Sequence, residues 1–390
     1  MRISRREWLA LSAGATAGLA LPAFGQDEKL RLETIREIGP ASNRLNFVFA
    51  AEGYDARSLE QFDRTISDLT RRLGEHAVFG EYSNFINTYR IREASSRPWD
   101  GTGKGTVFGV RVGSQNQDLV LDWAAAAKKL PASMPKNHVL AIIVNGAEAL
   151  RSKGGGAPRQ GRLATGSTWD IFLHEIGHAL GMLGDEYPDG GALSEELSIN
   201  VSPTGRDVPW APLLEGSPRG LGITKVPGIH RTFWKGEEQC IMAQNSNDFG
   251  PVCRWGMVLG ILRHVRLIEE STPARDQVVT PKTADRLDIK TLAPRGHGLR
   301  VRWVSRSVAS AKEFAAMQFL TPKAVRWETL EREKGWEPLR TAEGGVRLSE
   351  LAPGRHIVVA FIEDRHDWIV QDPWGTSRDV AAWAVEIPEK

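Results

Sequence analysis

Cysteine is scarce in this sequence of 390 residues, which contains only Cys240 and Cys253. Two cysteines are too few for a fold framed by disulfides, and too few for a structural zinc site made of cysteine alone. Net charge is also nearly absent, because the three arginines and one glutamate of residues 1–25 account for the whole excess of +2. The rest of the chain is neutral, which gives no electrostatic reason to expect binding to nucleic acid or to an anionic membrane.

The sequence also lacks a long apolar run. The apolar stretch that follows Trp8 is interrupted by serine, glycine and proline, whereas a bilayer span needs about 20 apolar residues. The stretch is preceded by Ser4-Arg5-Arg6-Glu7-Trp8-Leu9 and followed by the small residues of Ala23-Phe24-Gly25, a pattern typical of a twin-arginine export signal. We therefore expect a periplasmic or secreted protein that is exported already folded, with no membrane anchor once the signal is cleaved.

A composition of 41% apolar and 25% charged residues is that of a soluble globular chain, and the length allows two domains. Apolar periodicity predicts alternating strands and helices in the first half, whereas short alternating runs beyond Pro281 predict strands only. The glycines of 154–156 predict a loop over the active site. We expect a mixed α/β (α+β) catalytic domain of the zincin type with an appended β-sandwich. The chain would then consist of an export signal at 1–25, a linker at 26–42, the catalytic domain at 43–275 and the β-sandwich at 285–390. The strands expected in the first half are 45–50, 85–91 and 138–144, and the helices are 58–73 and 119–129.

The stretch that indicates the chemistry is His174-Glu175-Ile176-Gly177-His178. Ser167 and Asp170 resemble a capping box that starts a helix just before it. On a helix the two histidines lie one turn apart and face the same side, so both imidazoles can bind one ion. Glu175 is placed to take a proton from a water molecule that a metal ion has made acidic. The motif predicts a catalytic zinc site with Glu175 as general base.

A catalytic zinc ion needs a third protein ligand. In the metzincin pattern this ligand would stand at the position of Gly184, which has no side chain. Asp185 is our preferred ligand and Glu186 its main competitor, while His230 is a more distant alternative. Tyr187 is a candidate donor for the oxyanion, on its position in the sequence alone.

Further along the chain, Cys240-Ile241-Met242 precedes a second cysteine, Cys253. Met242 is a candidate for the Met-turn, the hydrophobic floor under the zinc histidines of metzincins. The two cysteines are close enough in sequence to form a disulfide after export, which is a simpler role for Cys240 than zinc ligation.

The sequence resembles the IgA-peptidase family of bacterial metallopeptidases (metallopeptidase family sixty-four). The resemblance rests on the zinc motif together with the segments Asn46–Tyr54, Leu183–Tyr187, Cys240–Met242 and Val252-Cys253. The resemblance covers roughly residues 43–263, and it implies a metzincin-like zinc endopeptidase closed by a Met-turn. The sequence departs from the family at Ala51-Glu52, where members usually have Gly-Asp. Nothing in these residues supports immunoglobulin A as the substrate.

We therefore predict an exported zinc endopeptidase with one zinc ion per chain, acting on a peptide or protein. A strand ending at Val144-Asn145 is a candidate to bind the peptide by strand addition. Two alternatives stay open: a zinc amidase acting on cell-wall peptides, and a non-catalytic protein that binds protein or glycan on a residual zincin scaffold. Glu175 argues against the second, because a binding protein needs no general base. No cysteine lies between Gln26 and the zinc motif, so we expect no cysteine-switch latency.

Overall fold

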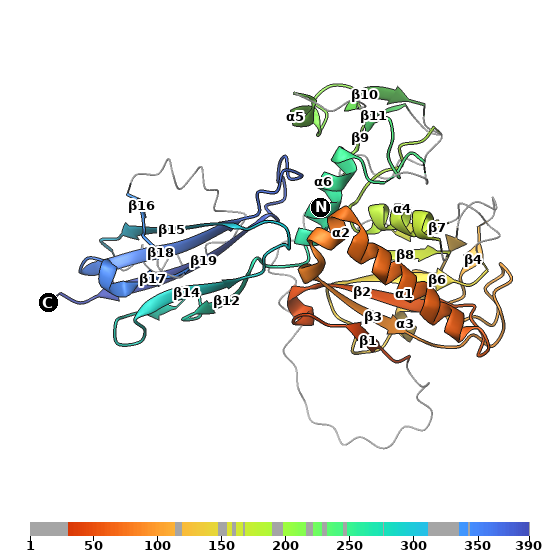
Figure 1. The fold of residues 1–390 in the computed structure, drawn as a ribbon, viewed down its shortest axis with the longest axis horizontal. Coiled ribbons are helices and arrows are strands. Elements are labelled where there is room, and N and C mark those ends of the chain that lie inside the picture. The colour runs from red at the N-terminus through yellow and green to blue at the C-terminus, as the bar shows by residue number, and fades with distance from the viewer. Residues whose placement is uncertain are drawn as a thin grey trace, which may run out of the picture.

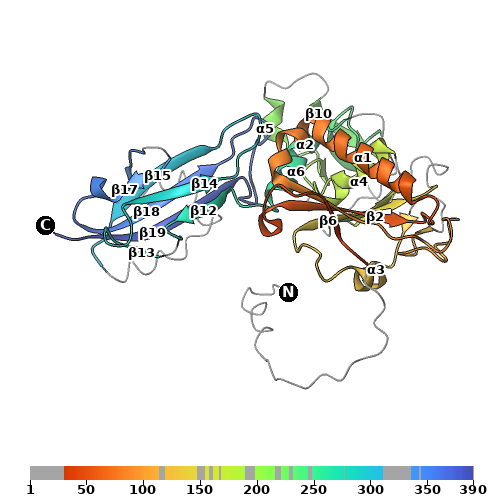
Figure 2. The same ribbon diagram turned by 60° about the horizontal axis from the view of Figure 1, so that its bottom comes forward.

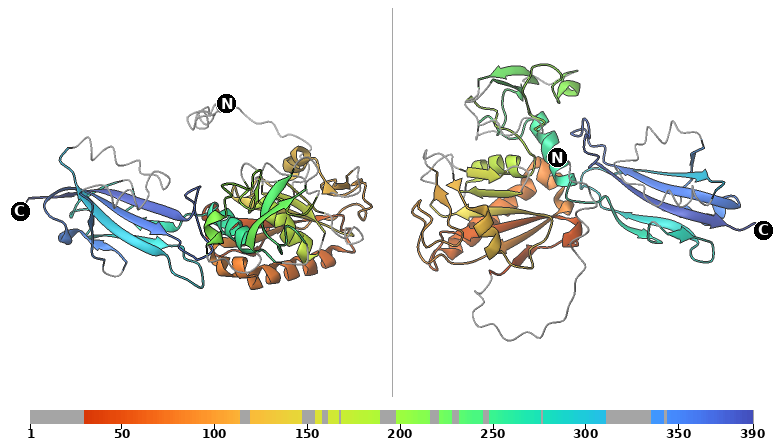
Figure 3. Two further views of the ribbon diagram at one scale, coloured as in Figure 1. Left: turned by 90° about the horizontal axis from the view of Figure 1, so that it is seen from above. Right: turned by 180° about the vertical axis from the view of Figure 1, so that it is seen from behind.

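A computed structural model gives the fold of most of the chain (Figure 1). Two groups of sheets lie at opposite ends of an elongated molecule, and the C-terminus lies at the end far from the helices (Figure 3). In the part of the chain that the structure describes, no helix is long and apolar enough to cross a membrane. The described residues are 30–389 apart from 114–118, 147–153, 158–160, 167, 189–197, 216–220, 228–231, 245–247, 276, 311–334 and 342–343. The expected export signal at 1–25 and His230 therefore lie outside them.

A six-stranded sheet forms the first half of the chain, in the order β1-β3-β2-β6-β8-β7. Its four inner strands are parallel, and the strand at each edge is antiparallel to its neighbour. All eight residues of β2 are buried, as expected for a parallel strand covered on both faces. The strands are β1 (Glu33–Arg36), β2 (Leu45–Glu52), β3 (Ile86–Ile91), β6 (His138–Val144), β7 (Gly154–Ala157) and β8 (Arg162–Thr165).

Alternate residues of β2 pack on opposite faces of this sheet. Phe47 and Phe49 share a core with α1, α4 and α6, whereas Val48 and Ala50 share a separate cluster with α3. Figure 2 shows α1 and α4 on one side of the sheet and α3 on the other. The helices are α1 (Leu59–Glu75), α2 (Ala77–Glu81), α3 (Trp123–Lys129), α4 (Trp169–Ala179), α5 (Ala211–Leu214) and α6 (Pro251–Leu262).

Two predictions for this half were wrong. The glycine-rich stretch expected to be a loop forms β7, because its backbone pairs with β8 from Gly154↔Thr165 to Ala157↔Arg162. The helix expected over 119–129 begins only at Trp123, since Leu119 and Val120 form β5 and pair with β4 (Arg111–Val112). Part of the stretch expected as a linker forms β1.

A small sheet follows the zinc motif in sequence. It has three strands in the order β10-β11-β9, with β9 (Val201–Ser202), β10 (Leu221–Val226) and β11 (Phe233–Glu237). In Figure 1 it lies at the top, beyond the outer end of α6. The chain then returns through α6 into the main core.

The C-terminal strands form two further sheets that share a hydrophobic cluster. Ala360 and Trp383 of the five-stranded sheet belong to the same cluster as Leu287 and Val346 of the three-stranded sheet. The strands predicted beyond Pro281 are therefore present, while their assignment as a β-sandwich stays a prediction. The strands are β12 (Ile268–Thr272), β13 (Val278–Val279), β14 (Arg286–Thr291), β15 (Arg300–Ser307), β16 (Glu337–Pro338), β17 (Val346–Arg347), β18 (Gly354–Glu363) and β19 (Arg378–Ile387).

Polar contacts join the C-terminal strands to the helices of the first half. The His297 ring contacts Glu81 through Nδ1 at 2.5 Å and Asp364 through Nε2 at 2.8 Å. The Tyr82 hydroxyl donates to the other oxygen of Asp364 at 2.9 Å, and the Trp255 indole on α6 donates to the Gln371 carbonyl at 2.8 Å. The C-terminal part therefore packs directly on the elements that carry the candidate site.

Candidate metal centre

The zinc motif lies on α4, whose residues from Ile171 to Ala179 are all buried. The helix begins at Trp169, and its N-cap is Thr168, which forms no side-chain capping hydrogen bond. Ser167 of the predicted capping box lies outside the described residues, and the buried apolar residues of α4 stabilise the helix through tertiary packing.

Three ligand atoms converge at the end of this helix. The Nε2 atoms of His174 and His178 lie 3.1 Å apart, and Oδ1 of Asp185 lies 3.2 Å from each of them. All three side chains are at most about one-tenth exposed. Two imidazoles and a carboxylate are a donor set that catalytic zinc accepts.

The outer nitrogen of each imidazole contacts a backbone carbonyl. His174 Nδ1 lies 3.0 Å from the Ile241 oxygen, and His178 Nδ1 lies 2.7 Å from the Leu183 oxygen. Because a carbonyl oxygen can only accept, each Nδ1 carries the hydrogen atom. In the neutral rings the lone pair is then on Nε2, directed at the point of convergence, as in metal-binding histidines.

The electrostatics at this point favour a cation. Asp185 Oδ1 is buried and has no hydrogen-bond partner in the described structure, so a positive ion would satisfy it. Burial alone would lower the pKa of His178, but the carboxylates of Asp185 and Glu175 outweigh it and raise this pKa to about 9. Burial would raise the pKa of Asp185, yet the two imidazoles hold it below its usual range. The residues present therefore fit a divalent metal ion.

The turn that carries Asp185 is fixed by a buried amide. Met182 has a positive φ of 55°, which reverses the chain after the helix. Asn200 accepts from the Gly184 amide at 2.9 Å and donates to the Gly184 carbonyl at 2.8 Å. It also donates to Glu186 Oε1 at 2.8 Å. The side chains of neighbouring Asp185 and Glu186 thereby point to different places, and only Asp185 reaches the imidazoles.

Residues 34–215, which contain α4 and this turn, match the family model described as IgA Peptidase M64. This segment belongs to the IgA peptidase M64 family. The family is one of metallopeptidases, so the donor set described above lies in the peptidase segment of the chain. Among curated proteins, no significant match to the chain was found.

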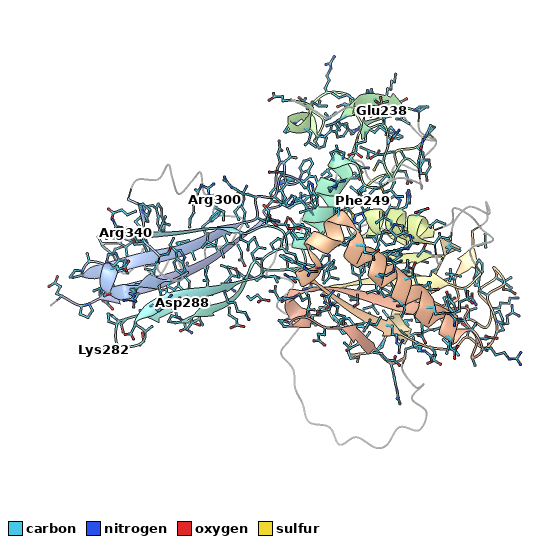
Figure 4. The ribbon with its side chains drawn as sticks, in the orientation of Figure 1. Glu238, Phe249, Lys282, Asp288, Arg300 and Arg340 are labelled. Carbon is cyan, nitrogen blue, oxygen red and sulfur yellow. The ribbon has the colours of Figure 1, made fainter. Side chains whose placement is uncertain are left out.

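Met242, predicted as the Met-turn residue of the peptidase, is fully buried next to α4. A Cβ atom at Gly177 would lie 2.5 Å from Met242 Sδ and 3.3 Å from Cε1 of Phe249. Phe249 is labelled in Figure 4, beside α4 and α6. The glycine of the motif therefore allows the methionine to pack directly against the helix between the two histidines.

Tyr187, the candidate oxyanion donor of the peptidase, lies beside the first histidine. Its ring is 6.4 Å from the His174 ring, centroid to centroid, with an angle of 29° between the planes, and the residue is 39% exposed. A partly exposed tyrosine beside His174 is accessible to a substrate bound at the site.

Cys240 and Cys253 are both buried, and the structure has them as free thiols. The predicted disulfide is therefore not present in it. Cys253 Sγ instead lies 3.1 Å from Glu186 Oε1, which gives this thiol a carboxylate as its partner.

The edge suggested for peptide binding was wrong. The strand that ends at Val144 is β6, which is paired on one side with β2 and on the other with β8. Its backbone groups are already used, so it cannot add another strand.

Sequence reasoning did not find Asn200 or Glu237. Neither belongs to a recognisable motif, and the fold brings both to the turn after α4: Asn200 donates to Glu186, and a carboxylate oxygen of Glu237 lies within 4.8 Å of one of Glu186. Glu52, noted as a departure from the family, has a structural role: its carboxylate accepts from the amides of Phe108 and Val110 at 2.7 Å each and so fixes their loop.

Proposed function

We propose that this chain is a zinc-dependent endopeptidase in which His174, His178 and Asp185 hold the metal ion and Glu175 is the general base. The observation that carries the proposal is the convergence of two Nε2 atoms and one buried, unsatisfied carboxylate oxygen in a segment of the M64 family. Glu186 is not the third ligand of this site in the proposal, because its Oε1 contacts Asn200 and Cys253, on a different side of the turn from the two histidines.

A zinc ion in this site would supply Lewis acidity toward the scissile carbonyl and make a nucleophilic water available at neutral pH. Glu175 takes the proton of that water and passes it to the leaving amine. Its carboxylate is buried and close enough to His178 to influence its pKa. The Tyr187 hydroxyl donates a hydrogen bond to the developing oxyanion.

Glu175→Gln tests the general base, because it keeps the size of the side chain and removes only its basicity. We expect both chains to bind zinc in this site equally. Casein hydrolysis by the variant should fall by about 10²–10⁴-fold, the usual contribution of a general base. Chelation should abolish hydrolysis by the native chain, and added zinc should restore it.

Other outcomes of this assay would favour the rival functions. Hydrolysis of cell-wall peptides but not of casein would indicate the amidase. Zinc binding without hydrolysis of either substrate class would indicate a binding protein on a zincin scaffold. Equal activity of both chains would contradict the role of Glu175.

The proposal includes a zincin-type catalytic domain at 43–275, an appended β-sandwich at 285–390 and export by the twin-arginine route. The shared cluster of the two C-terminal sheets supports the β-sandwich. Replacement of Arg5 and Arg6 by lysine should retain the protein in the cytoplasm, as cell fractionation would show. Unchanged export of that variant would contradict the assigned route.

A further inference from the structure

A second set of metal-ligating side chains lies next to the turn that carries Asp185. It consists of Glu186, Glu237, Cys240 and Cys253, which we call the thiol–carboxylate cluster. Each residue offers one ligand atom, and the four atoms lie within 4.8 Å of one another. The exposed fraction of each residue is between 0% and 2%. Four potential ligands from separate parts of the chain are thus gathered in the core.

The carboxylates of this cluster are only half satisfied. Glu186 Oε1 accepts from Asn200 at 2.8 Å and lies 3.1 Å from Cys253 Sγ, and Glu237 Oε1 accepts from the amides of Val252 and Cys253. The second oxygens, Glu186 Oε2 and Glu237 Oε2, are buried and have no hydrogen-bond partner among the described residues. Two neighbouring buried carboxylates with free oxygens repel each other unless one of them takes up a proton or a cation lies between them, and a cation can contact both free oxygens at once.

We propose that the thiol–carboxylate cluster is a second metal site, which binds one structural zinc ion through two thiolates and two carboxylates. Zinc accepts sulfur and oxygen ligands together in a tetrahedron, and a site with four protein ligands leaves no position for substrate. The chain would then hold two zinc ions, one more than the sequence motif predicts.

The surroundings offset the charge of such a site. Two thiolates and two carboxylates carry four negative charges, of which a divalent ion neutralises two. The positive charges of Lys235 and Arg254 act on Glu186 and Glu237, respectively. Glu237 also accepts from the first turn of α6, where the helix dipole is positive. A Cβ atom at Gly250 would collide with this carboxylate, so the glycine lets Glu237 lie directly against the start of α6.

A disulfide satisfies the cluster less well than a metal ion does. Oxidation of Cys240 and Cys253 would remove the thiol that contacts Glu186 Oε1. Both carboxylates would then stay buried with no added positive partner. A zinc ion instead contacts the free oxygen of each carboxylate and both sulfur atoms.

The second ion would stabilise the first site. Glu186 directly follows Asp185, and the Glu186 amide donates to the Met242 carbonyl at 2.9 Å. An ion that ties Glu186 to β11 and α6 therefore fixes the turn that presents Asp185. Its role is structural, because none of its ligands belongs to the set formed by His174, His178 and Asp185.

Elemental analysis of the full chain, purified under reducing conditions, tests the stoichiometry. We expect two zinc ions in the native chain and one in His174→Ala/His178→Ala, with the remaining ion in the cluster. We also expect one in Cys240→Ser/Cys253→Ser, held by the histidine site. Met257→Leu, a change of similar volume on α6 at a side chain outside both sets of ligands, is the matched control and should keep two.

Cobalt substitution and X-ray absorption identify the ligands and do not depend on the folding of the cysteine variant. Cobalt in His174→Ala/His178→Ala should show thiolate-to-metal charge transfer, and its zinc form should show sulfur at about 2.3 Å from the metal. One zinc ion in the native chain, with no sulfur ligand, would overturn the proposal, whether the cysteines are free or joined as a disulfide.

Discussion

Replacing Gly177 by alanine tests how closely Met242 packs against α4, the helix that carries the two histidines. The added Cβ would lie 2.5 Å from Met242 Sδ, well inside the contact distance of about 3.5–4.0 Å. Met242 is fully buried and Phe249 is 1% exposed, so neither has space into which to move. Overpacking of a core costs about 1–3 kcal/mol, whereas glycine to alanine in a helix gains up to about 1 kcal/mol. We expect Gly177→Ala to lower the free energy of unfolding by about 1–2 kcal/mol.

Gly74→Ala is the matched control, since it lies in α1 and its new Cβ would meet no atom within 4 Å. This variant should be more stable than the native chain by up to about 1 kcal/mol. Urea unfolding of the metal-free chains measures both changes without a contribution from zinc.

A double-mutant cycle identifies the clashing partner. Met242→Ala alone should cost about 2–5 kcal/mol, because it leaves a cavity. In the Met242→Ala background the methyl group at position 177 has space, so the two effects should be non-additive by about 1–3 kcal/mol. Additive effects, or a Gly177→Ala chain as stable as the native one, would refute the packing argument.

Three further changes test other parts of the structure. Asn200→Ala should weaken zinc binding in the histidine site by about 10–100-fold, as measured by competition with a chelator, because the turn loses its buried amide. Burial lowers the pKa of His264 to about 4, so the unfolded chain binds a proton more readily. The free energy of unfolding should therefore fall by up to about 3 kcal/mol between pH 6.5 and 4, and this fall should shrink in His264→Gln. His297→Ala should lower the free energy of unfolding by about 3 kcal/mol, because it leaves Glu81 and Asp364 facing each other without the imidazole.

Each of these predictions has an opposing result. Unchanged zinc affinity in Asn200→Ala would show that the turn is held by other contacts. An equal acid-induced loss of stability in His264→Gln and the native chain would assign that loss to other groups. For His297→Ala, unchanged stability in urea would show that this contact does not hold the two parts together.

The elements with strong local patterns could be predicted from the sequence. The strand predicted over 138–144 is β6 with the same bounds, and the helix predicted over 58–73 is α1. Both depend on apolar spacing, which is a local property. The glycine-rich β7 could not be predicted, because glycine has little strand propensity and only the pairing with β8 holds the stretch extended.

In the candidate site, too, the residues of one helix could be predicted from the sequence, whereas contacts between distant segments could not. Helical spacing was enough to place His174 and His178 on one face, because both residues belong to one element. The choice between Asp185 and Glu186 depended on Asn200, which is distant in sequence and binds Glu186. The environment of Cys253 could not be predicted from the sequence either, because its carboxylate partner, Glu186, comes from the turn after α4.

The central claim is that His174, His178 and Asp185 together bind zinc. Anomalous diffraction at the zinc edge from crystals of the zinc-loaded native chain tests it most directly. The account predicts an anomalous peak bounded by the Nε2 atoms of the two histidines and Oδ1 of Asp185. Zinc bound elsewhere in the crystal, with no peak between these three atoms, would contradict it.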